Sequence, residues 1–447
     1  MAKTIFICQE CGATALRWSG KCSSCNNWNT LIEEVQSSSS SKSKSKTKSM
    51  QTKTLADVSS SKDVPRISSG INELDQVFGG GIVPGSVTLL AGEPGVGKST
   101  LLLQLSANIA SLKPVLYVSG EESIQQIKLR ADRLGVSAKQ LELLTETDID
   151  VVTATIESGD YAFVVVDSIQ TMQTDELSSS AGTISQITAC THKLSGVAKS
   201  RDTAVLVVGH VTKEGNIAGP KILEHLVDVV MYLEGERFGS FKMIRGNKNR
   251  YGSTNEVGIF EMTDGGMSAV ANPSERFLQE RTGSDGSVVL ATIEGTRALL
   301  VEVQALVSTS PFGYPKRTAV GFDLNRLNLL IAVLQQRAGL KLADKDVYIN
   351  IVGGMKLAEP AADLAIALAI ASAAKKQPLN SDLVVYGEVG LSGEIRSVSD
   401  SDKRNKEAAK LKFSKALAPK IKSNSVDSKF VLPVKNLSEA IDKGLKT

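Results

Sequence analysis

Residues 92–99 constrain the fold of this chain more than any other segment, because they read Gly-Glu-Pro-Gly-Val-Gly-Lys-Ser. Glycines at these spacings let successive backbone N–H groups turn inward around a bound anion. Lys98 can then reach the β- and γ-phosphates of a nucleotide, and the hydroxyl of Ser99 can ligate Mg²⁺. The segment predicts a loop that binds ATP. Its expected nucleotide-binding residues are Gly92, Glu93, Pro94, Gly95, Val96, Gly97, Lys98, Ser99 and Thr100.

The flanking segments have the structure that such a loop requires. Val87–Ala91 is a short apolar run typical of a buried strand, and leucine and isoleucine recur at helical spacing after Ser99. A helix that begins there directs the positive end of its dipole at the phosphates. A glycine-rich turn that matches the motif by chance would lack this order of strand, loop and helix.

The whole-chain properties fit a soluble protein of two or three domains. The chain has 447 residues, with 51 Lys and Arg against 48 Asp and Glu, and a formal net charge of +3. Affinity for nucleic acid therefore has to come from local patches of charge. No apolar run is as long as a membrane span, and the N-terminus lacks the apolar core of a signal peptide. We expect a cytoplasmic protein with no membrane partner.

The cysteines predict a metal site. Four of the five cysteines form two Cys-x-x-Cys pairs near the N-terminus. Disulfides are the alternative, but two such pairs in a cysteine-poor chain are typical of tetrahedral thiolate ligation of zinc. The segment between the pairs is too short to bury a core, so the metal would hold it together. The expected zinc ligands are Cys8, Cys11, Cys22 and Cys25.

Composition divides the rest of the chain. Residues 36–54 are rich in Ser, Lys and Thr and have little to bury, which predicts a flexible tether. Residues 66–272 alternate strands with helices, which predicts an α/β fold with a doubly wound, mainly parallel sheet. Helices are expected after the phosphate loop, Glu122 and Thr183. The expected strands are Val87–Ala91, Val115–Ser119, Phe163–Asp167, Ala204–Gly209 and Val227–Leu233.

The remaining residues predict a separate α+β domain. Strands are expected at Ser287–Ile293, Leu299–Leu306 and Val347–Val352, with an amphipathic helix at Asp323–Arg337. The helix Ala361–Ala374 is apolar nearly all round, which predicts a central buried helix. The expected domains are a four-cysteine zinc element at 1–30, a linker at 31–65, the α/β domain at 66–272 and the α+β domain at 273–447.

Two strand ends carry the acidic residues that nucleotide hydrolysis requires. The apolar strand Phe163–Asp167 ends in a carboxylate, and Asp167 would hold Mg²⁺ through water. The strand Val115–Ser119 is followed by Glu121 and Glu122, and either can orient the water that attacks the γ-phosphate. Both glutamates also suit the start of a helix, where the dipole favours negative charge. We choose Glu121 as the base and keep Glu122 as the alternative.

Lys248-Asn249-Arg250-Tyr251-Gly252 is the second motif with chemical content. It follows an expected strand at Phe241–Ile244 and an expected turn at Gly246-Asn247. In an extended chain, Lys248 and Arg250 project from one face. Paired cations can reach a nucleotide on a neighbouring subunit, as an arginine finger does, or they can bind a DNA phosphate. A solvated turn is the third interpretation, and spacing alone leaves all three open.

Polar segments beside the sheet are candidates for nucleic-acid contacts. His210 follows the strand that ends at Gly209, where it can sense the γ-phosphate and pass its loss to the next loop. That loop, Val211–Lys221, and the polar segment Thr171–Thr183 are predicted to be mobile loops on one edge of the sheet. Such loops can line a channel for single-stranded nucleic acid, although ordinary surface loops have the same composition.

The order of these motifs resembles a known family. The four-cysteine element, Gly-Glu-Pro-Gly-Val-Gly-Lys-Ser-Thr, the Lys-Asn-Arg-Tyr-Gly box and the C-terminal domain resemble the bacterial DNA repair proteins of the RadA (Sms) family. The resemblance covers essentially the whole chain outside the tether, although the family usually has Phe in place of Tyr251. It implies an N-terminal zinc ribbon-like element, a RecA-like ATPase core and a C-terminal domain similar to that of Lon proteases.

The resemblance also implies an activity. It implies a DNA-dependent ATPase that forms a ring on single-stranded and branched DNA. Likeness to the replicative helicase implies that the ring is hexameric. Such a ring drives branch migration together with the recombinase RecA, using ATP, Mg²⁺ and Zn²⁺. A nucleotide-gated RecA mediator without translocation and an ATP-dependent protease are the alternatives. By motif match, the catalytic residues are Lys98, Glu121, Asp167, Lys248 and Arg250, the last two acting in trans.

The likeness to Lon raises the question of proteolysis. Lon-type peptidases pair a Ser nucleophile with a Lys base. The position of the Ser holds Ala361, and the position of the Lys falls at Asp402, next to Lys403. The domain is therefore expected to be an oligomerisation and DNA-binding scaffold, with weak local packing in the polar stretch Ser399–Lys406. Candidate phosphate contacts are Arg276, Lys316, Arg317 and Lys345.

Overall fold

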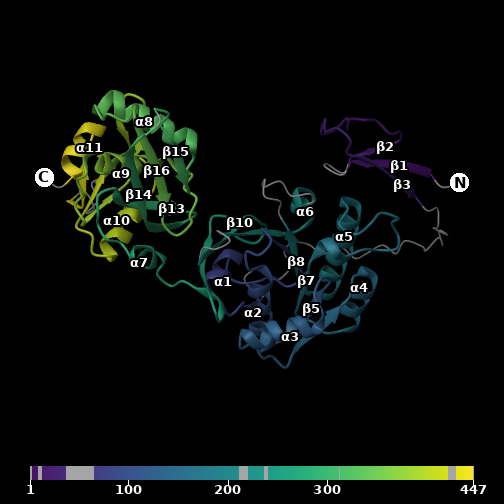
Figure 1. Ribbon diagram of the computed structural model, residues 1–447. Helices are drawn as coiled ribbons and strands as arrows, with labels where there is room; N and C mark the ends of the chain where they lie inside the picture. Colours follow the sequence, from purple (N-terminus) through teal and green to yellow (C-terminus); the bar gives the residue numbers. More distant parts are fainter. Residues whose placement is uncertain are drawn as a thin grey trace, which may run out of the picture. The chain divides into compact units, whose positions relative to one another are not determined.

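The computed structural model describes residues 3–8, 13–36, 65–210, 220–235, 240–311, 313–420 and 429–445. The chain divides into two compact units, Met1–Arg237 with Lys242–Ala269, and Phe238–Phe241 with Val270–Thr447. Figure 1 shows the elements of each unit coloured along the sequence. Among the described helices, none is long and apolar enough to cross a membrane.

A small antiparallel sheet begins the first unit. Its strands β1 (Lys3–Cys8), β2 (Thr14–Ala15) and β3 (Leu31–Gln36) lie in the order β2-β1-β3. β3 pairs with the whole of β1, so the N-terminal element continues past residue 30 to Gln36. The buried core of this sheet consists of Cys8, Cys22 and Leu31. Such a small core needs a further source of stability, which is consistent with a metal.

The first unit also contains a nine-stranded sheet in the order β12-β11-β10-β9-β4-β8-β7-β5-β6. The strands from β9 to β6 are parallel, whereas β10 pairs antiparallel with β9, and β12 with β11. The strands are β4 (Val87–Gly92), β5 (Val115–Ser119), β6 (Leu141–Thr145), β7 (Phe163–Asp167), β8 (Ala204–His210), β9 (Val229–Glu234), β10 (Phe241–Asn249), β11 (Val257–Thr263) and β12 (Gly266–Ala269).

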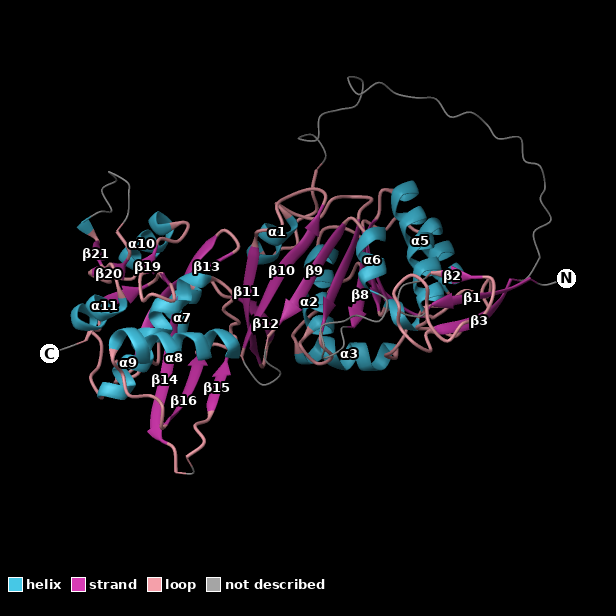
Figure 2. Cartoon of the chain, turned by 90° about the horizontal axis from the view of Figure 1, so that it is seen from above, coloured by secondary structure: helices cyan, strands magenta, loops and turns pink. Residues whose placement is uncertain are grey.

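Helices cover both faces of this sheet, as strands that are apolar on both sides require. One face packs against α1, α2 and α3, and the opposite face packs against α4, α5 and α6 (Figure 2). The expected α/β fold with a mainly parallel sheet is confirmed. The helices are α1 (Asn72–Phe78), α2 (Lys98–Ala110), α3 (Ile124–Arg133), α4 (Ile149–Ser158), α5 (Ile184–Arg201) and α6 (Pro220–Leu226).

The second unit is an α+β domain on a mixed sheet in the order β15-β16-β14-β13-β17-β20-β21. α9 (Asp363–Lys375) packs on β13 and β14, and α8 and α11 pack on α9. Every residue of α9 up to Ala373 is buried, which confirms the expected central helix. The strands are β13 (Ser287–Glu294), β14 (Arg297–Thr309), β15 (Arg317–Val320), β16 (Lys345–Ile351), β17 (Leu383–Val385), β20 (Lys415–Ala418) and β21 (Val431–Pro433). The other helices are α7 (Pro273–Leu278), α8 (Leu324–Ala338), α10 (Ser401–Lys410) and α11 (Leu437–Gly444), and a small hairpin joins β18 (Glu388–Val389) to β19 (Ile395–Arg396).

The expected turn at Gly246-Asn247 is wrong. β10 continues through both residues, and its register against β9 shifts between Gly246 and Lys248. This shift is a β-bulge, in which an extra residue bends and twists the strand without ending it. Glycine suits a bulge as well as a turn, so the sequence signal is the same for both.

The expected weak packing of Ser399–Lys406 is also wrong. Arg404 is fully buried on α10, and its guanidinium forms hydrogen bonds to the Ala291 carbonyl (2.6 Å) and the Glu359 carboxylate. Asn405 accepts a hydrogen bond of 2.9 Å from the Tyr386 hydroxyl. Two residues of the polar stretch therefore belong to a buried polar network, while most of the others face water.

Candidate functional site

The segment 92–99 forms the loop between β4 and α2 that its sequence predicts. Gly97 has a φ of 114°, which L side chains rarely adopt, and lies at the start of α2. A Cβ at Gly97 would lie 2.5 Å from Cε of Met262, and a Cβ at Gly92 would lie 2.6 Å from the carbonyl oxygen of Leu233. Backbone conformation and close packing therefore both require glycine in this loop.

Lys98 is a buried cation that folds back on the loop. Its Nζ donates hydrogen bonds to the carbonyl oxygens of Gly92 (2.7 Å) and Glu93 (3.0 Å), and the residue is only 4% exposed. Burial lowers the pKa of Lys98 to about 8, although the nearby charges of Asp167 and Glu121 act in the opposite direction. An anionic ligand at the loop would stabilise the ammonium further.

The acidic residues lie at the same edge of the sheet as this loop. In the parallel strands, Gly92 on β4 is level with His210 on β8, and Ser119 on β5 is level with Asp167 on β7. In parallel α/β sheets, ligands bind at the carboxyl ends of the strands. We call the carboxyl ends of these strands, at Gly92, Ser119, Asp167 and His210, the nucleotide edge.

Asp167 is a largely buried carboxylate at the end of β7. It is 7% exposed and accepts a hydrogen bond of 2.8 Å from the hydroxyl of Tyr117. Burial and the charge of Asp167 raise the pKa of Tyr117 well above its usual value, so Tyr117 stays a donor. A carboxylate and the Ser99 hydroxyl are oxygen donors of the kind that Mg²⁺ prefers. The residues present therefore fit a nucleotide with Mg²⁺.

The two candidate bases differ in their surroundings. One carboxylate oxygen of Glu121 accepts a hydrogen bond of 2.6 Å from the Ser168 hydroxyl and lies 3.4 Å from Nε2 of His210. Glu122 instead forms an ion pair with Arg130 on α3. Glu121 thus faces the nucleotide edge together with His210. Ser168 was missed in the sequence analysis, because only the three-dimensional structure brings it to Glu121.

Lys248 and Arg250 lie near the amino ends of the parallel strands, opposite to the nucleotide edge. Asn249 of β10 pairs with Val229 at the start of β9, which runs parallel to β4 and begins level with Thr88. The motif therefore lies beside the amino end of β4, whereas the phosphate loop follows its carboxyl end. We call this the basic edge. The strand between the two edges spans six residues, or roughly 17 Å at about 3.3 Å per residue.

The cations of the basic edge contact the end of α6 and the segment that joins α6 to β9. Nζ of Lys248 donates to the carbonyl oxygens of Glu224 (2.6 Å) and Val227 (2.8 Å), and Arg250 pairs with Asp228 at 2.9 Å. Burial and the neighbouring Arg250 charge lower the pKa of Lys248. Side chains two residues apart point to one side here, as the extended chain predicts.

Only part of the expected DNA-facing loops is described. Residues 211–219 of the predicted loop Val211–Lys221 lie outside the described residues. The segment Thr171–Thr183 is held by Gln186 of α5. The Gln186 side chain accepts a hydrogen bond from the N–H of Thr174 (2.9 Å) and donates one to the Ser179 carbonyl (2.9 Å). Thr174 and Gln186 are both buried, so this segment is fixed to α5 more firmly than the prediction of a mobile loop implied.

Three of the N-terminal cysteines lie close enough together to hold a metal ion. The sulfurs of Cys8, Cys22 and Cys25 lie within 4.8 Å of one another, and those of Cys8 and Cys25 are 3.6 Å apart. Tetrahedral zinc with Zn–S bonds of about 2.3 Å separates its sulfurs by roughly 3.8 Å. The N–H of Ser24 also points at the Cys22 sulfur, at 3.4 Å. The geometry fits zinc, and the expected fourth ligand, Cys11, lies outside the described residues.

The second unit has an ion pair, Arg404 with Glu359, near the two positions that were compared with the catalytic pair of Lon. Ala361 is 1% exposed and offers no nucleophile, and Lys403 pairs with Asp400 (3.0 Å) on the exposed side of α10. The buried neighbour is Arg404, which binds Glu359 at 2.7 Å. Burial raises the pKa of Glu359, but hydrogen bonds from Arg404 outweigh that effect and hold the pKa below its usual value.

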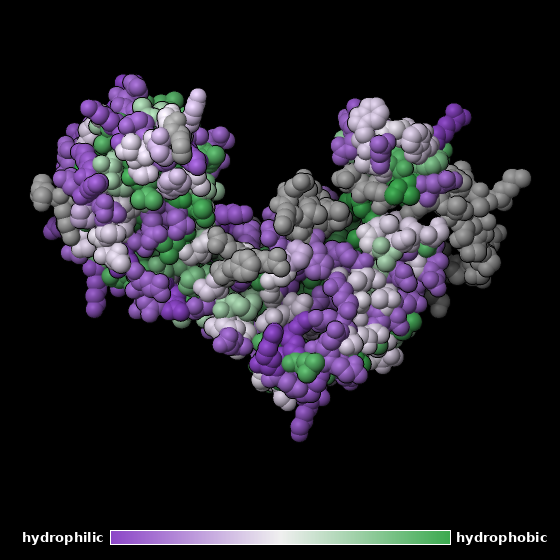
Figure 3. Space-filling view, in the orientation of Figure 1, coloured by the Kyte–Doolittle hydropathy of each residue, from purple (hydrophilic) through white to green (hydrophobic). Residues whose placement is uncertain are grey.

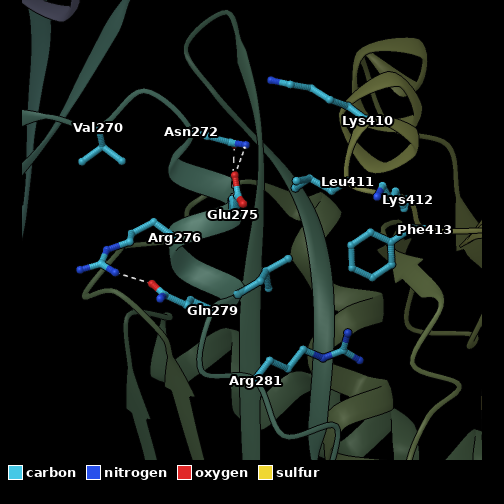
Figure 4. Close-up of a pocket in the computed structure, with 11 residues that line it drawn as sticks. Val270, Asn272, Glu275, Arg276, Gln279, Arg281, Lys410, Leu411, Lys412 and Phe413 are labelled. Carbon is cyan, nitrogen blue, oxygen red and sulfur yellow. Dashed lines mark hydrogen bonds between the residues drawn. The ribbon is translucent and has the colours of Figure 1, made fainter.

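The candidate phosphate contacts of the second unit have different surroundings. Arg317 donates to the main-chain carbonyls of Lys345 and Leu342, and Nζ of Lys345 donates to the Thr309 hydroxyl at 2.9 Å. Lys316 is exposed. Arg276 lies in a basic pocket of about 880 Å³ and contacts Gln279 (Figure 4). The pocket is lined by Val270, Asn272, Glu275, Arg276, Leu278, Gln279, Arg281, Lys410, Leu411, Lys412 and Phe413.

Known proteins share these features. Residues 6–33 match the family described as "Rubredoxin metal binding domain", residues 54–216 match "AAA domain", and residues 313–422 match "Subunit ChlI of Mg-chelatase". Proteins named "DNA repair protein RadA" are 50% identical in Halalkalibacterium halodurans (93% of this chain, 92% of that protein) and 49% in Bacillus subtilis (94% and 93%). The protein of that name in Listeria monocytogenes is 48% identical over 99% of this chain and 98% of its own. The chain therefore belongs to the RadA family of DNA repair proteins and is a RecA-like ATPase with an N-terminal zinc ribbon.

Proposed function

We propose that this chain is the subunit of a hexameric, ring-shaped ATPase that moves on single-stranded and branched DNA. Its activity is to drive branch migration of recombination intermediates together with the recombinase RecA, in the cytoplasm. Support comes from the family, whose members are named as DNA repair proteins, and from the positions of the two cationic motifs on one chain. The positions of these motifs carry most of the proposal.

The nucleotide edge would hold ATP. Lys98 would exchange its two loop carbonyls for the β- and γ-phosphates, and its burial makes that exchange favourable. Ser99 and Asp167 would hold Mg²⁺, which supplies charge neutralisation when it is bound. Glu121 would orient the attacking water, because its partners Ser168 and His210 fix its carboxylate at this edge.

The basic edge would complete the site of another subunit. Lys248 and Arg250 lie at the end of β4 opposite to the phosphate loop, so they are remote from the nucleotide of their own chain. A ring places unlike surfaces of successive copies in contact, because its interfaces are head to tail. We propose that each ring interface joins the nucleotide edge of one subunit to the basic edge of the next. The two cations would then stabilise charge on the γ-phosphate during hydrolysis.

Hydrolysis would be coupled to DNA through His210. This side chain lies 3.4 Å from Glu121 and immediately before the segment 211–221, which the sequence predicts to be a polar loop. Loss of the γ-phosphate would change the contacts of Glu121 and His210, and the following loop would pass the change to DNA in the ring channel. Proteolysis is not part of the proposal, since Ala361 has no hydroxyl.

A branch-migration assay without RecA tests this function. The full-length protein would be incubated with a three-strand DNA intermediate labelled on the displaced strand, with ATP or with ADP. We expect ATP-dependent strand displacement by the wild type and none by Lys98→Ala. ATP hydrolysis without strand displacement would contradict the motor and would support a nucleotide-gated mediator that loads RecA without translocation.

A further inference from the structure

The zinc ribbon exposes both tryptophans of the chain. The sequence contains only two tryptophans, and aromatic residues make up 4% of the total. Trp18 is 60% exposed and Trp28 is 69% exposed, although large aromatic side chains are ordinarily buried on folding. The neighbouring Leu16 and Ile32 are also exposed, and apolar side chains reach the surface of this ribbon in Figure 3. An exposed apolar patch of this kind marks an interaction surface.

The two indoles converge on one point of the backbone. A Cβ built on Gly20 would lie 3.5 Å from the ring of Trp28 and 4.0 Å from the ring of Trp18. Lys21 and Trp28 form an antiparallel bridge that closes the turn carrying Cys22 and Cys25. The zinc thiolates therefore brace the turn that presents Trp28, and the rings stand on a rigid support.

The charge around the rings is positive. Nζ of Lys21 lies 5.9 Å from the ring centroid of Trp28, and Arg17 is exposed next to Trp18. Residues 13–30 contain these two cations and no carboxylate, whereas the whole chain has nearly as many acidic as basic residues. Flat apolar rings beside two cations suit a ligand with planar bases and a negative backbone.

We propose that the zinc ribbon binds single-stranded nucleic acid by stacking bases on Trp18 and Trp28, with Arg17 and Lys21 on the phosphates. Specific binding of a protein partner would also require complementary charges and hydrogen-bonding groups, and the patch offers few of these. A nucleic acid requires less, because every base has a face that stacks on an indole. This contact is separate from the nucleotide edge and needs no ATP. It would hold the DNA strand independently of the cycle of hydrolysis.

Intrinsic tryptophan fluorescence tests this contact directly, because both fluorophores lie on the ribbon. The full-length, zinc-loaded protein would be titrated with oligothymidine in the absence of nucleotide. We expect saturable quenching with oligothymidine and little quenching with an abasic oligonucleotide of the same length, which keeps the phosphates but has no bases. The variant Lys98→Ala should quench like the wild type, so failure of the proposed motor would not affect the result.

Substitutions separate stacking from charge. Binding of a dye-labelled oligothymidine should weaken about tenfold in Trp18→Ala and in Trp28→Ala, and much less in the conservative Trp28→Phe, because phenylalanine still stacks. Retention of one zinc per chain in each variant would show that the ribbon is folded. Absence of quenching by oligothymidine, or equal quenching by the abasic strand, would overturn the proposal. Wild-type quenching is informative even where a variant loses its zinc.

Discussion

The two edges of the nine-stranded sheet differ in what they can do alone. The nucleotide edge gathers a glycine loop, a buried lysine and two carboxylates, a set of groups that fits a nucleotide. The basic edge holds Lys248 and Arg250, whose side chains contact two carbonyls and a carboxylate among the described residues. In the proposed function, one chain would carry two parts of a hydrolytic site at opposite ends of its strands. If that proposal holds, assembly as well as folding is needed to complete the site.

The largest effect is expected from removing the cation of the nucleotide edge. Lys98→Ala should lower kcat/KM for ATP by at least about 10³-fold, because both binding and transition-state stabilisation are lost. Steady-state ATP hydrolysis measures the effect, and Lys113→Ala, which removes an exposed lysine just after α2, is the matched control. Substantial hydrolysis by Lys98→Ala would show that this edge is not where ATP reacts.

A comparable loss with a different pattern is expected at the basic edge. Lys248→Ala should reduce DNA-stimulated ATP hydrolysis by on the order of 10³-fold and abolish branch migration, as removal of a finger residue does. Binding of ATP and DNA should remain, because Lys248 lies away from its own nucleotide. The matched control is Arg245→Ala on the same strand, where Arg245 pairs with Glu234. Normal branch migration by Lys248→Ala would refute a trans-acting role.

Substitutions of the two glutamates after β5 should differ in their effect on kcat by about two orders of magnitude. Glu121→Gln should lower kcat roughly 10²-fold, since a glutamine cannot accept the proton of the attacking water. Glu122→Gln should change kcat less than about twofold, because Glu122 pairs with Arg130 away from the site. Single-turnover hydrolysis compares the two variants. The reverse order of effects would make Glu122 the base.

The smallest effect is a pH dependence of nucleotide affinity. The pKa of Lys98 is lowered to about 8, and bound phosphate would raise it, so binding above that pH requires uptake of a proton. The dissociation constant for ATP should therefore increase as the pH rises above 8, by up to about tenfold per pH unit. A fluorescent ATP analogue can report it, and Lys98→Arg should show no such rise. A flat profile in the wild type would contradict the burial argument.

Much of the nucleotide edge could be predicted from sequence because its signals are local. The strands at Val115–Ser119 and Phe163–Asp167 have the predicted bounds, since uninterrupted apolar runs between polar residues define buried parallel strands. The strand β6 was missed because it is half exposed at the edge of the sheet, where mixed polarity weakens the strand signal. The helix α4 was also missed, although its buried residues Ile149, Val152 and Ile156 recur at helical spacing. The roles of the predicted site residues stay predictions.

Long-range contacts could not be predicted from local pattern. The contact of Ser168 with Glu121 joins residues that follow two neighbouring strands, β7 and β5, and only the order of strands in the sheet reveals it. The polar stretch around Arg404 was expected to pack weakly, because composition does not show that Glu359 lies opposite it in the core. The position of Lys248 at the far edge likewise depends on β10 continuing through a bulge that the sequence reads as a turn.

Mixing two inactive variants tests the composite site most directly. Lys98→Ala keeps an intact basic edge, and Lys248→Ala keeps an intact nucleotide edge, so a mixed ring contains some interfaces with both intact parts. At equal amounts, about one quarter of the interfaces of a randomly mixed ring should be complete. We predict recovery of DNA-stimulated ATP hydrolysis toward that fraction of the wild-type rate, while each variant alone stays inactive. A mixture that is no more active than the sum of its two variants would contradict the account.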